Sequence, residues 1–189
     1  TPYAHFAPEV LAEINHLNDS CKELDHAKIR EAMTQWVRTT KKKVVVCAEM
    51  TYQIPLLDEL LIDKLPEDVK PYVLKHEYWW PDEGTSFMRK SQALISMECH
   101  SVIMTLANGT PAFYVRQKED TVKGQMYYDL GFSDWVFEID QTSGEHIFER
   151  LMEVYNNPQM ASDLINKNIN HAKELITEGT LDVKKLMGW

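Results

Sequence analysis

The feature that most constrains the fold of this chain is an alternation of short apolar runs with stretches of helical spacing. Five runs have the length and the β-branched or aromatic content of buried strands, namely KKKVVVCAEM, YVLKHEYWW, ALISME, PAFYV and WVFEI. Strands buried on both faces are typical of parallel sheets, whose neighbouring strands need a long crossover connection. The alternation therefore predicts an α/β domain with a doubly wound, mainly parallel sheet.

The segments around these runs predict helices. Residues 1–24 show weak periodicity and read as an arm, whereas apolar residues recur at helical spacing over 27–39, after a plausible N-cap at Asp25. Between the strands, helical or irregular connections are predicted over residues 55–65, 82–92, 100–108 and 120–131.

The pattern changes after the fifth apolar run and predicts paired helices. Ser143 is placed to cap the first, and Asn157–Pro158 is the start signature of the second, which we expect to run to Gly179. We therefore divide the chain into an N-terminal arm and helix over residues 1–42 and an α/β domain with C-terminal helices over 43–189.

Charge and hydropathy restrict the partners. The net charge is −9, and the only dense basic run, Lys41–Lys43, reads as the solvated start of a strand, so no nucleic-acid function is expected. No apolar stretch approaches the roughly 18 residues needed to span a bilayer, so we expect no membrane span.

The three cysteines are widely spaced and form no C-x-x-C pair, which argues against a disulfide framework or a zinc site. Glu98, Cys99 and His100 are consecutive, and consecutive side chains rarely converge on one ion, so no metal site is predicted. This cysteine usage fits a reducing compartment, and we expect a cytoplasmic protein. The sequence begins at Thr1, and an upstream targeting segment would not be visible in it.

Polar side chains gather where the predicted strands end. In an open parallel sheet, ligands bind beyond the carboxyl ends of the strands. The residues at these ends are Glu49 for the first strand, His76 and Glu77 for the second, Glu98, Cys99 and His100 for the third, Arg116 and Lys118 for the fourth, and Glu138 and Asp140 for the fifth.

His100 and Cys99 each have a functional and a structural interpretation. The N-terminus of a helix attracts anions, and a histidine there can donate a proton to a bound ligand. A lone histidine is more often a cap or a crevice-filling residue. Cys99 is a conceivable thiolate nucleophile, but a small buried residue is the favoured interpretation.

The remaining candidates have the same two interpretations. Arg116, Lys118 and Lys123 form either a solvated loop or a phosphate-facing one. Gly109–Thr110 reads as a helix C-cap whose backbone is also placed to line a ligand crevice. Trp79–Trp80 are packing residues or an aromatic wall that suits a sugar.

The stretch ALISMECHSVIMTLANGTPAFYV, with KGQMYYDLG and WVFEI after it, resembles the polysaccharide pyruvyl transferase family. The most specific part of the resemblance is H-S…G-T-P…K-G, formed by His100–Ser101, Gly109–Pro111 and Lys123–Gly124, followed by Leu130–Gly131. The resemblance covers roughly residues 43–178.

The resemblance implies the carboxyl-terminal half of a glycosyltransferase-B-like architecture of two Rossmann-like domains, with a missing N-terminal domain as partner. It implies transfer of a pyruvyl group from phosphoenolpyruvate, a co-substrate rather than a cofactor, to a sugar or polysaccharide precursor. His100 would be the active-site histidine, and Ser101, Gly109, Thr110, Arg116, Lys118 and Lys123 would lie on the donor side. Glu49, Glu77, Trp79 and Trp80 are then candidates for the acceptor side.

The chain departs from the family at Glu98, where the family commonly carries a donor-binding arginine. A carboxylate there repels phosphoenolpyruvate, so another cation substitutes or the donor differs; we keep Glu98 with His100 as a catalytic candidate. The alternatives are a glycosyltransferase that uses a nucleotide sugar and a non-catalytic carbohydrate-binding or assembly module. A homo-oligomer is compatible with each of them.

Overall fold

The computed structural model describes residues 6–188, so residues 1–5 of the predicted arm and Trp189 lie outside the described part. The chain divides into two compact units. Unit 1 holds the residues up to Trp80 and Thr142–Glu149, and unit 2 holds Pro81–Gln141 and the residues from Arg150 onward. Each unit contains one small parallel sheet with helices, which confirms the prediction of an α/β chain with parallel strands.

Unit 1 contains a two-stranded sheet and a long helix. Its elements are α1 (Pro8–Thr40), β1 (Val44–Cys47), the 3-10 turn η1 (Thr51–Gln53), α2 (Ile54–Leu56), the π-helix η2 (Leu57–Ile62), the 3-10 turn η3 (Lys70–Tyr72) and β2 (Val73–His76). β1 and β2 are parallel, with Val44 opposite Val73 and Cys47 opposite His76.

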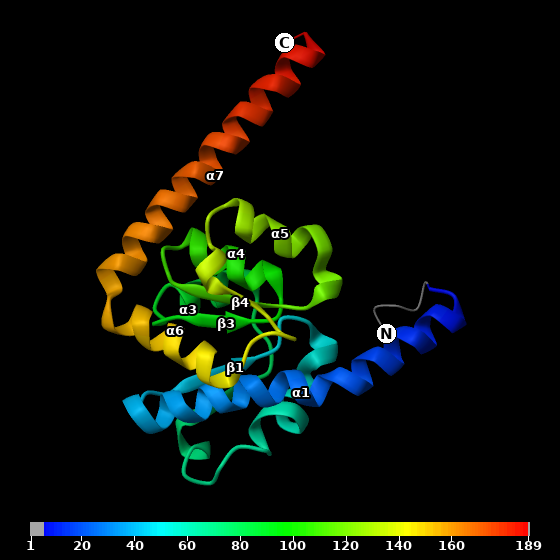
Figure 1. Ribbon diagram of the computed structural model, residues 1–189, viewed down its shortest axis with the longest axis vertical. Helices are drawn as coiled ribbons and strands as arrows, with labels where there is room; N and C mark the ends of the chain where they lie inside the picture. The colour runs from blue at the N-terminus through cyan, green and yellow to red at the C-terminus, as the bar shows by residue number, and fades with distance from the viewer. Residues whose placement is uncertain (1–5, 189) are drawn as a thin grey trace. The chain divides into compact units, whose positions relative to one another are not determined.

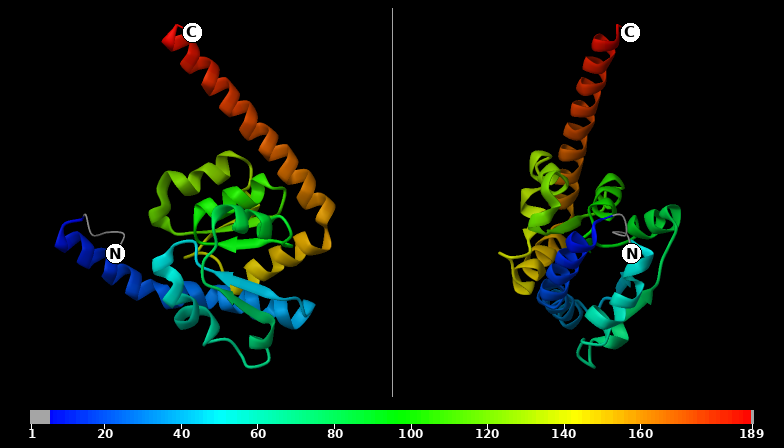
Figure 2. Two further views of the ribbon diagram at one scale, coloured as in Figure 1. Left: turned by 180° about the vertical axis from the view of Figure 1, so that it is seen from behind. Right: turned by 90° about the vertical axis from the view of Figure 1, so that its right-hand side faces the viewer.

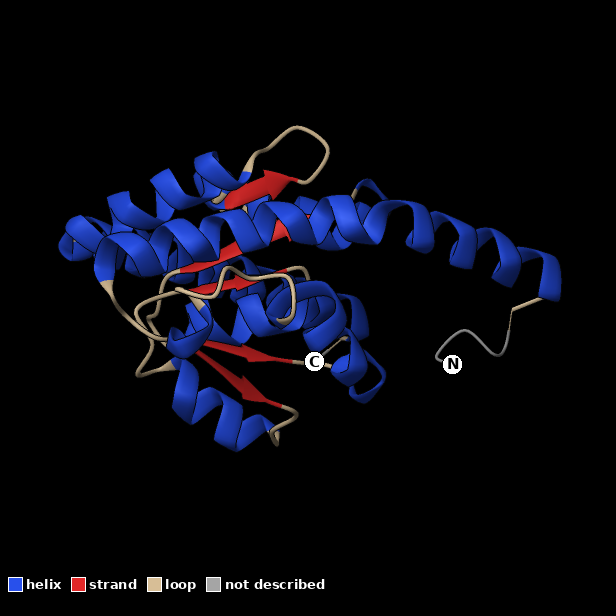
Figure 3. Cartoon of the chain, turned by 90° about the horizontal axis from the view of Figure 1, so that it is seen from below, coloured by secondary structure: helices blue, strands red, loops and turns tan. Residues whose placement is uncertain are grey.

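The α1 helix is the largest departure from the sequence-based prediction. It is one continuous helix of 33 residues (Figure 3), so the predicted arm was wrong over residues 8–24. Pro8 stands in its first turn, where a missing N–H costs nothing. Apolar residues recur at spacings of four and three among the polar ones, a weak helical signal, at Val10, Ile14, Leu17, Cys21 and Leu24.

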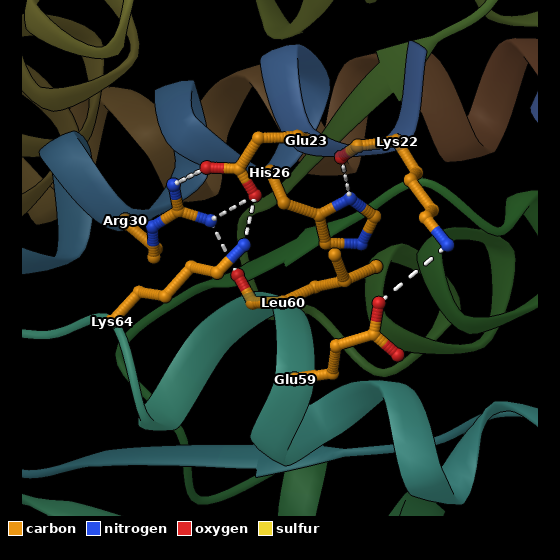
Figure 4. A network of polar contacts seen from close by, with 7 residues as sticks. All are labelled: Lys22, Glu23, His26, Arg30, Glu59, Leu60 and Lys64. Atoms are coloured by element: carbon orange, nitrogen blue, oxygen red, sulfur yellow. Dashed lines mark hydrogen bonds and ion pairs between the residues drawn. The ribbon is translucent and has the colours of Figure 1, made fainter. Parts of the chain in front are cut away.

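A polar network joins α1 to η2 in unit 1 (Figure 4). Arg30 donates one hydrogen bond to the Leu60 carbonyl and another to the Glu23 carboxylate, both 2.5 Å long. Lys64 also donates to Glu23, and the hydrogen bonds from Lys64 and Arg30 lower the pKa of that carboxyl. The ion pair of Lys64 with Glu23 is solvent exposed and contributes little energy, whereas the hydrogen bond from the part-buried Arg30 to Leu60 fixes η2 against α1.

Unit 2 contains a three-stranded parallel sheet in the order β3-β4-β5. Its elements are α3 (Pro81–Met88), β3 (Leu94–Ser96), α4 (Cys99–Ala107), β4 (Ala112–Arg116), the 3-10 turn η4 (Lys118–Asp120), α5 (Thr121–Asp129), the 3-10 turn η5 (Ser133–Trp135), β5 (Val136–Glu138) and α7 (Pro158–Met187), while α6 (Gly144–Asn156) contributes to both units. Figure 1 shows α4 beside β3 and β4, which it contacts. The central strand β4 is buried from Ala112 to Val115.

The sequence predicts one five-stranded sheet, whereas the described strands form two sheets. Within each sheet the strands follow chain order, so the described pairing contains no reversal of strand order. The second strand is also much shorter than its apolar run, because only Val73–His76 is extended and Leu74 in its middle is exposed. The prediction assumed a strand covered by other elements on both faces, whereas the exposed Leu74 shows that one face of β2 is not covered.

The α7 helix continues beyond its predicted end at Gly179 and reaches Met187, with Gly188 as a left-handed C-cap. A glycine inside a helix costs about 1 kcal/mol relative to alanine, which good helix formers on both sides can offset. In two further views the distal part of α7 extends away from the rest of its own unit (Figure 2), and its side chains from Lys173 onward are exposed.

Candidate functional site

The turn from β3 into α4 places His100 at the start of a helix. Ser96 shapes this turn, because its Oγ accepts the Glu98 N–H at 2.9 Å and donates to the Glu98 carbonyl at 3.1 Å. Glu98 is extended and takes the N-cap position, so Cys99 and His100 are the first two residues of α4. His100 is exposed and Ser101 is half-buried. The imidazole therefore lies at the carboxyl end of the sheet, as predicted from the strand ends.

Cys99 is buried, which matches the structural interpretation of this residue rather than that of an exposed nucleophile. Its carbonyl accepts a hydrogen bond of 2.5 Å from the hydroxyl of Tyr127, a buried residue of α5. The first turn of α4 is thus attached to α5.

Arg116, at the carboxyl end of β4, is held by several partners. Its Nη1 lies 2.5 Å from Glu138 Oε1, and its Nη2 donates to the Thr121 carbonyl at 3.1 Å. The Tyr128 hydroxyl donates to the same Glu138 oxygen at 2.8 Å, and the guanidinium carbon lies 6.0 Å from the centre of the Tyr128 ring. The hydrogen bond to Glu138 raises the pKa of Arg116.

The backbone of α5 also makes room for this arginine. A Cβ atom on Gly124 would collide with the Arg116 side chain. The glycine of the K-G motif therefore leaves the space that this side chain occupies. Arg116 is neutralised by Glu138 and is not the freely available anion clamp that the sequence suggested. Arg116 and Glu138 are register partners on β4 and β5. Opposite charges at the ends of two neighbouring strands are the sequence signal that could have predicted this ion pair.

Lys118 and Lys123 lie on the segment that follows β4. Both side chains are exposed, and the Lys118 ammonium is 3.8 Å from a Glu119 oxygen. Lys123 stands in the first turn of α5. These lysines are exposed cations that follow the carboxyl end of β4, whereas Arg116 is bound to Glu138.

Gly109 and Thr110 are not brought together with His100. Gly109 has φ +79° and donates its N–H to the Leu106 carbonyl at 3.0 Å, while the Thr110 N–H reaches the Thr105 carbonyl at 3.2 Å. They follow Asn108, the C-cap of α4, and precede β4, whereas Cys99 and His100 begin α4. The two groups are separated by the length of α4, about 13 Å. Their role at the end of α4 accounts for both residues, so they are no longer candidates for donor binding.

The acceptor-side candidates all lie in unit 1. Glu49 follows β1, and Glu77, Trp79 and Trp80 follow β2, so they extend from neighbouring strand ends. Trp79 is half-buried, whereas the Trp80 side chain is 71% exposed. The Tyr78 ring meets the Trp80 ring edge to face at 6.3 Å.

Within residues 6–188, no cluster of three or more histidine, cysteine, aspartate or glutamate side chains has the arrangement of a metal site. No helix in that range has the length and apolarity needed to cross a membrane. Comparison with protein-family models and with curated proteins finds no match to this chain. The functional assignment therefore depends on the motif residues and on their geometry.

Proposed function

We propose that this chain is the donor-side part of a transferase that moves a pyruvyl group from phosphoenolpyruvate to a sugar of a cell-surface glycan or its precursor. The observation that carries the proposal is the position of His100, exposed in the first turn of α4 at the carboxyl end of a parallel sheet. The finer fold assignment, a doubly wound Rossmann-like half of a glycosyltransferase-B-like architecture, is part of the same proposal.

The chemistry requires a proton donor and a base. His100 protonates the methylene carbon of phosphoenolpyruvate, and a sugar hydroxyl adds to the adjacent carbon. Departure of inorganic phosphate then lets a second hydroxyl close the ketal. Of the two hydroxyl protons, one restores His100 and the other leaves with phosphate. Glu98, two residues before His100, is the candidate base for the incoming hydroxyls.

The donor carries a phosphate and a carboxylate, so it needs compensating positive charge. The positive end of the α4 helix dipole supplies part of it, and the exposed Lys118 and Lys123 supply two cations. Because Glu138 already neutralises Arg116, we assign Arg116 to holding the segment that carries these lysines.

A thermal-shift titration tests the proposal. Phosphoenolpyruvate at 100 times its dissociation constant should stabilise the protein by about 2.7 kcal/mol, and nucleotide sugars should not. His100→Ala should abolish the shift without lowering the melting temperature of the free protein, and His171→Ala, an exposed histidine on α7, is the matched control. A shift with nucleotide sugars alone would favour the glycosyltransferase alternative.

A carbohydrate-binding module is the second candidate, favoured by the exposed Trp80 and its contact with Tyr78. An exposed indole face suits stacking on a sugar ring, and this contact needs no donor. Oligosaccharide binding that survives His100→Ala, that is lost in Trp80→Ala, and that occurs without any response to phosphoenolpyruvate would establish this alternative.

A further inference from the structure

Two tyrosines from different elements are buried side by side in unit 2. Tyr114 belongs to the central strand β4 and Tyr127 to α5. Both are almost fully buried, and their ring centres are 4.8 Å apart. Buried tyrosines normally have a hydrogen-bond partner for the hydroxyl, and the partners of this pair lie on two different segments.

The Tyr127 hydroxyl holds the start of α4 through the Cys99 carbonyl, which accepts its hydrogen bond at 2.5 Å. Cys99 immediately precedes His100 in the first turn. A movement of α5 relative to α4 would break this buried bond and leave a buried hydroxyl and a buried carbonyl without it, which is costly. The bond therefore fixes the peptide that carries His100.

The Tyr114 hydroxyl holds the segment before α5. It donates to Asp120 Oδ2 at 2.7 Å, and the same oxygen accepts the Gln117 N–H at 3.1 Å. Burial and the hydrogen bond to Asp120 both raise the pKa of Tyr114, so the hydroxyl keeps its proton. The turn between β4 and α5 is thereby fixed to the strand.

Lys123 precedes Tyr127 by four residues in α5. Residues at this spacing lie one above the other on the same helix face. The face of α5 that contacts the first turn of α4 through Tyr127 is thus also the face from which Lys123 projects.

We infer that Tyr127, supported by Tyr114, is a positioning residue of the donor site, which holds His100 and Lys123 in a fixed relation. The inference rests on the proposed function. Its ligand is an anion that bears both phosphate and carboxylate groups, and phosphoenolpyruvate is the probe. Tyr127 acts through the Cys99 carbonyl and needs no contact with the ligand.

The experiment compares Tyr127→Phe with Tyr128→Phe in the full chain. Each variant loses one hydroxyl that donates a hydrogen bond and keeps its ring, but Tyr128 bonds to Glu138 instead of the His100 turn. We expect Tyr127→Phe to weaken phosphoenolpyruvate binding about tenfold and Tyr128→Phe to change it less than twofold, as about 1.4 kcal/mol corresponds to tenfold.

Amide hydrogen exchange provides a readout without ligand. Exchange in the first two turns of α4 should be faster in Tyr127→Phe than in the wild type and unchanged in Tyr128→Phe. Unchanged exchange in Tyr127→Phe, or equal losses of affinity in the two variants, would overturn the positioning role. If the wild type does not bind phosphoenolpyruvate at all, the proposed function fails, and the role in donor binding fails with it even where the exchange result holds.

Discussion

The position of the Arg116 side chain requires a residue without a Cβ atom at Gly124. We expect Gly124→Ala to lower the free energy of unfolding by about 1–3 kcal/mol, because the new Cβ would overlap an arginine that Glu138 and the Thr121 carbonyl hold in place. Gly179→Ala is the control, since a Cβ there meets nothing within 4 Å, and helix propensity should stabilise it by about 1 kcal/mol. Denaturant unfolding measures both. If both substitutions stabilise the protein, the close packing of Arg116 against Gly124 is contradicted.

His26 makes unit 1 sensitive to acid. Burial lowers the pKa of its imidazole in the folded state, while its Nδ1 lies 2.6 Å from the Lys22 carbonyl. The unfolded chain therefore binds the proton more readily. The contribution of the neutral His26 to stability is fully present above the pKa of the unfolded chain, about 6.5, and is lost as the pH falls through the lower pKa of the folded state. Melting curves from pH 7 to pH 5 should show this loss in the wild type and in the exposed control His16→Gln, and a weaker one in His26→Gln.

At the scale of elements, α7 combines a buried half with an exposed half. Ile165 is 2% exposed and Ile176 is 70% exposed on the same helix. Ile165→Ala should cost about 2–4 kcal/mol through lost burial and a cavity, whereas Ile176→Ala should stay within about 0.5 kcal/mol. Equilibrium unfolding of the two variants measures the difference. A large cost for Ile176→Ala would show that the distal half is covered in solution.

The elements also show which features the sequence can predict. The series from β3 to β5 was predicted to within two or three residues at most boundaries, because its signals are local: apolar runs, and glycines of positive φ at Gly109 and Gly131 just after helix ends. The first half of α1 was missed because its narrow apolar stripe lies among polar residues. Local patterns do not encode strand pairing, so they gave neither the two separate sheets nor the partner of Arg116.

At the scale of the whole molecule, the net charge of −9 opposes the binding of an anionic donor. Binding then depends on positive charge close to the ligand, which Lys118 in η4 and Lys123 in the first turn of α5 provide. Salt screens the distant repulsion and the nearby attraction alike, but the nearby term is larger at low ionic strength.

We therefore expect the affinity of the wild type for phosphoenolpyruvate to fall as salt rises from about 0.02 to 0.3 M, over which the Debye length shortens several-fold. The double variant Lys118→Gln, Lys123→Gln should bind more weakly, and its affinity should rise with salt, because the repulsion from the net negative charge then outweighs the remaining attraction at the start of α4. Lys173→Gln with Lys184→Gln, on the exposed part of α7, makes the same change in net charge and should keep the wild-type salt dependence. Isothermal titration at several salt concentrations measures all three proteins. If affinity changes with salt in the same direction in both double variants, net charge rather than the lysines after β4 controls donor binding.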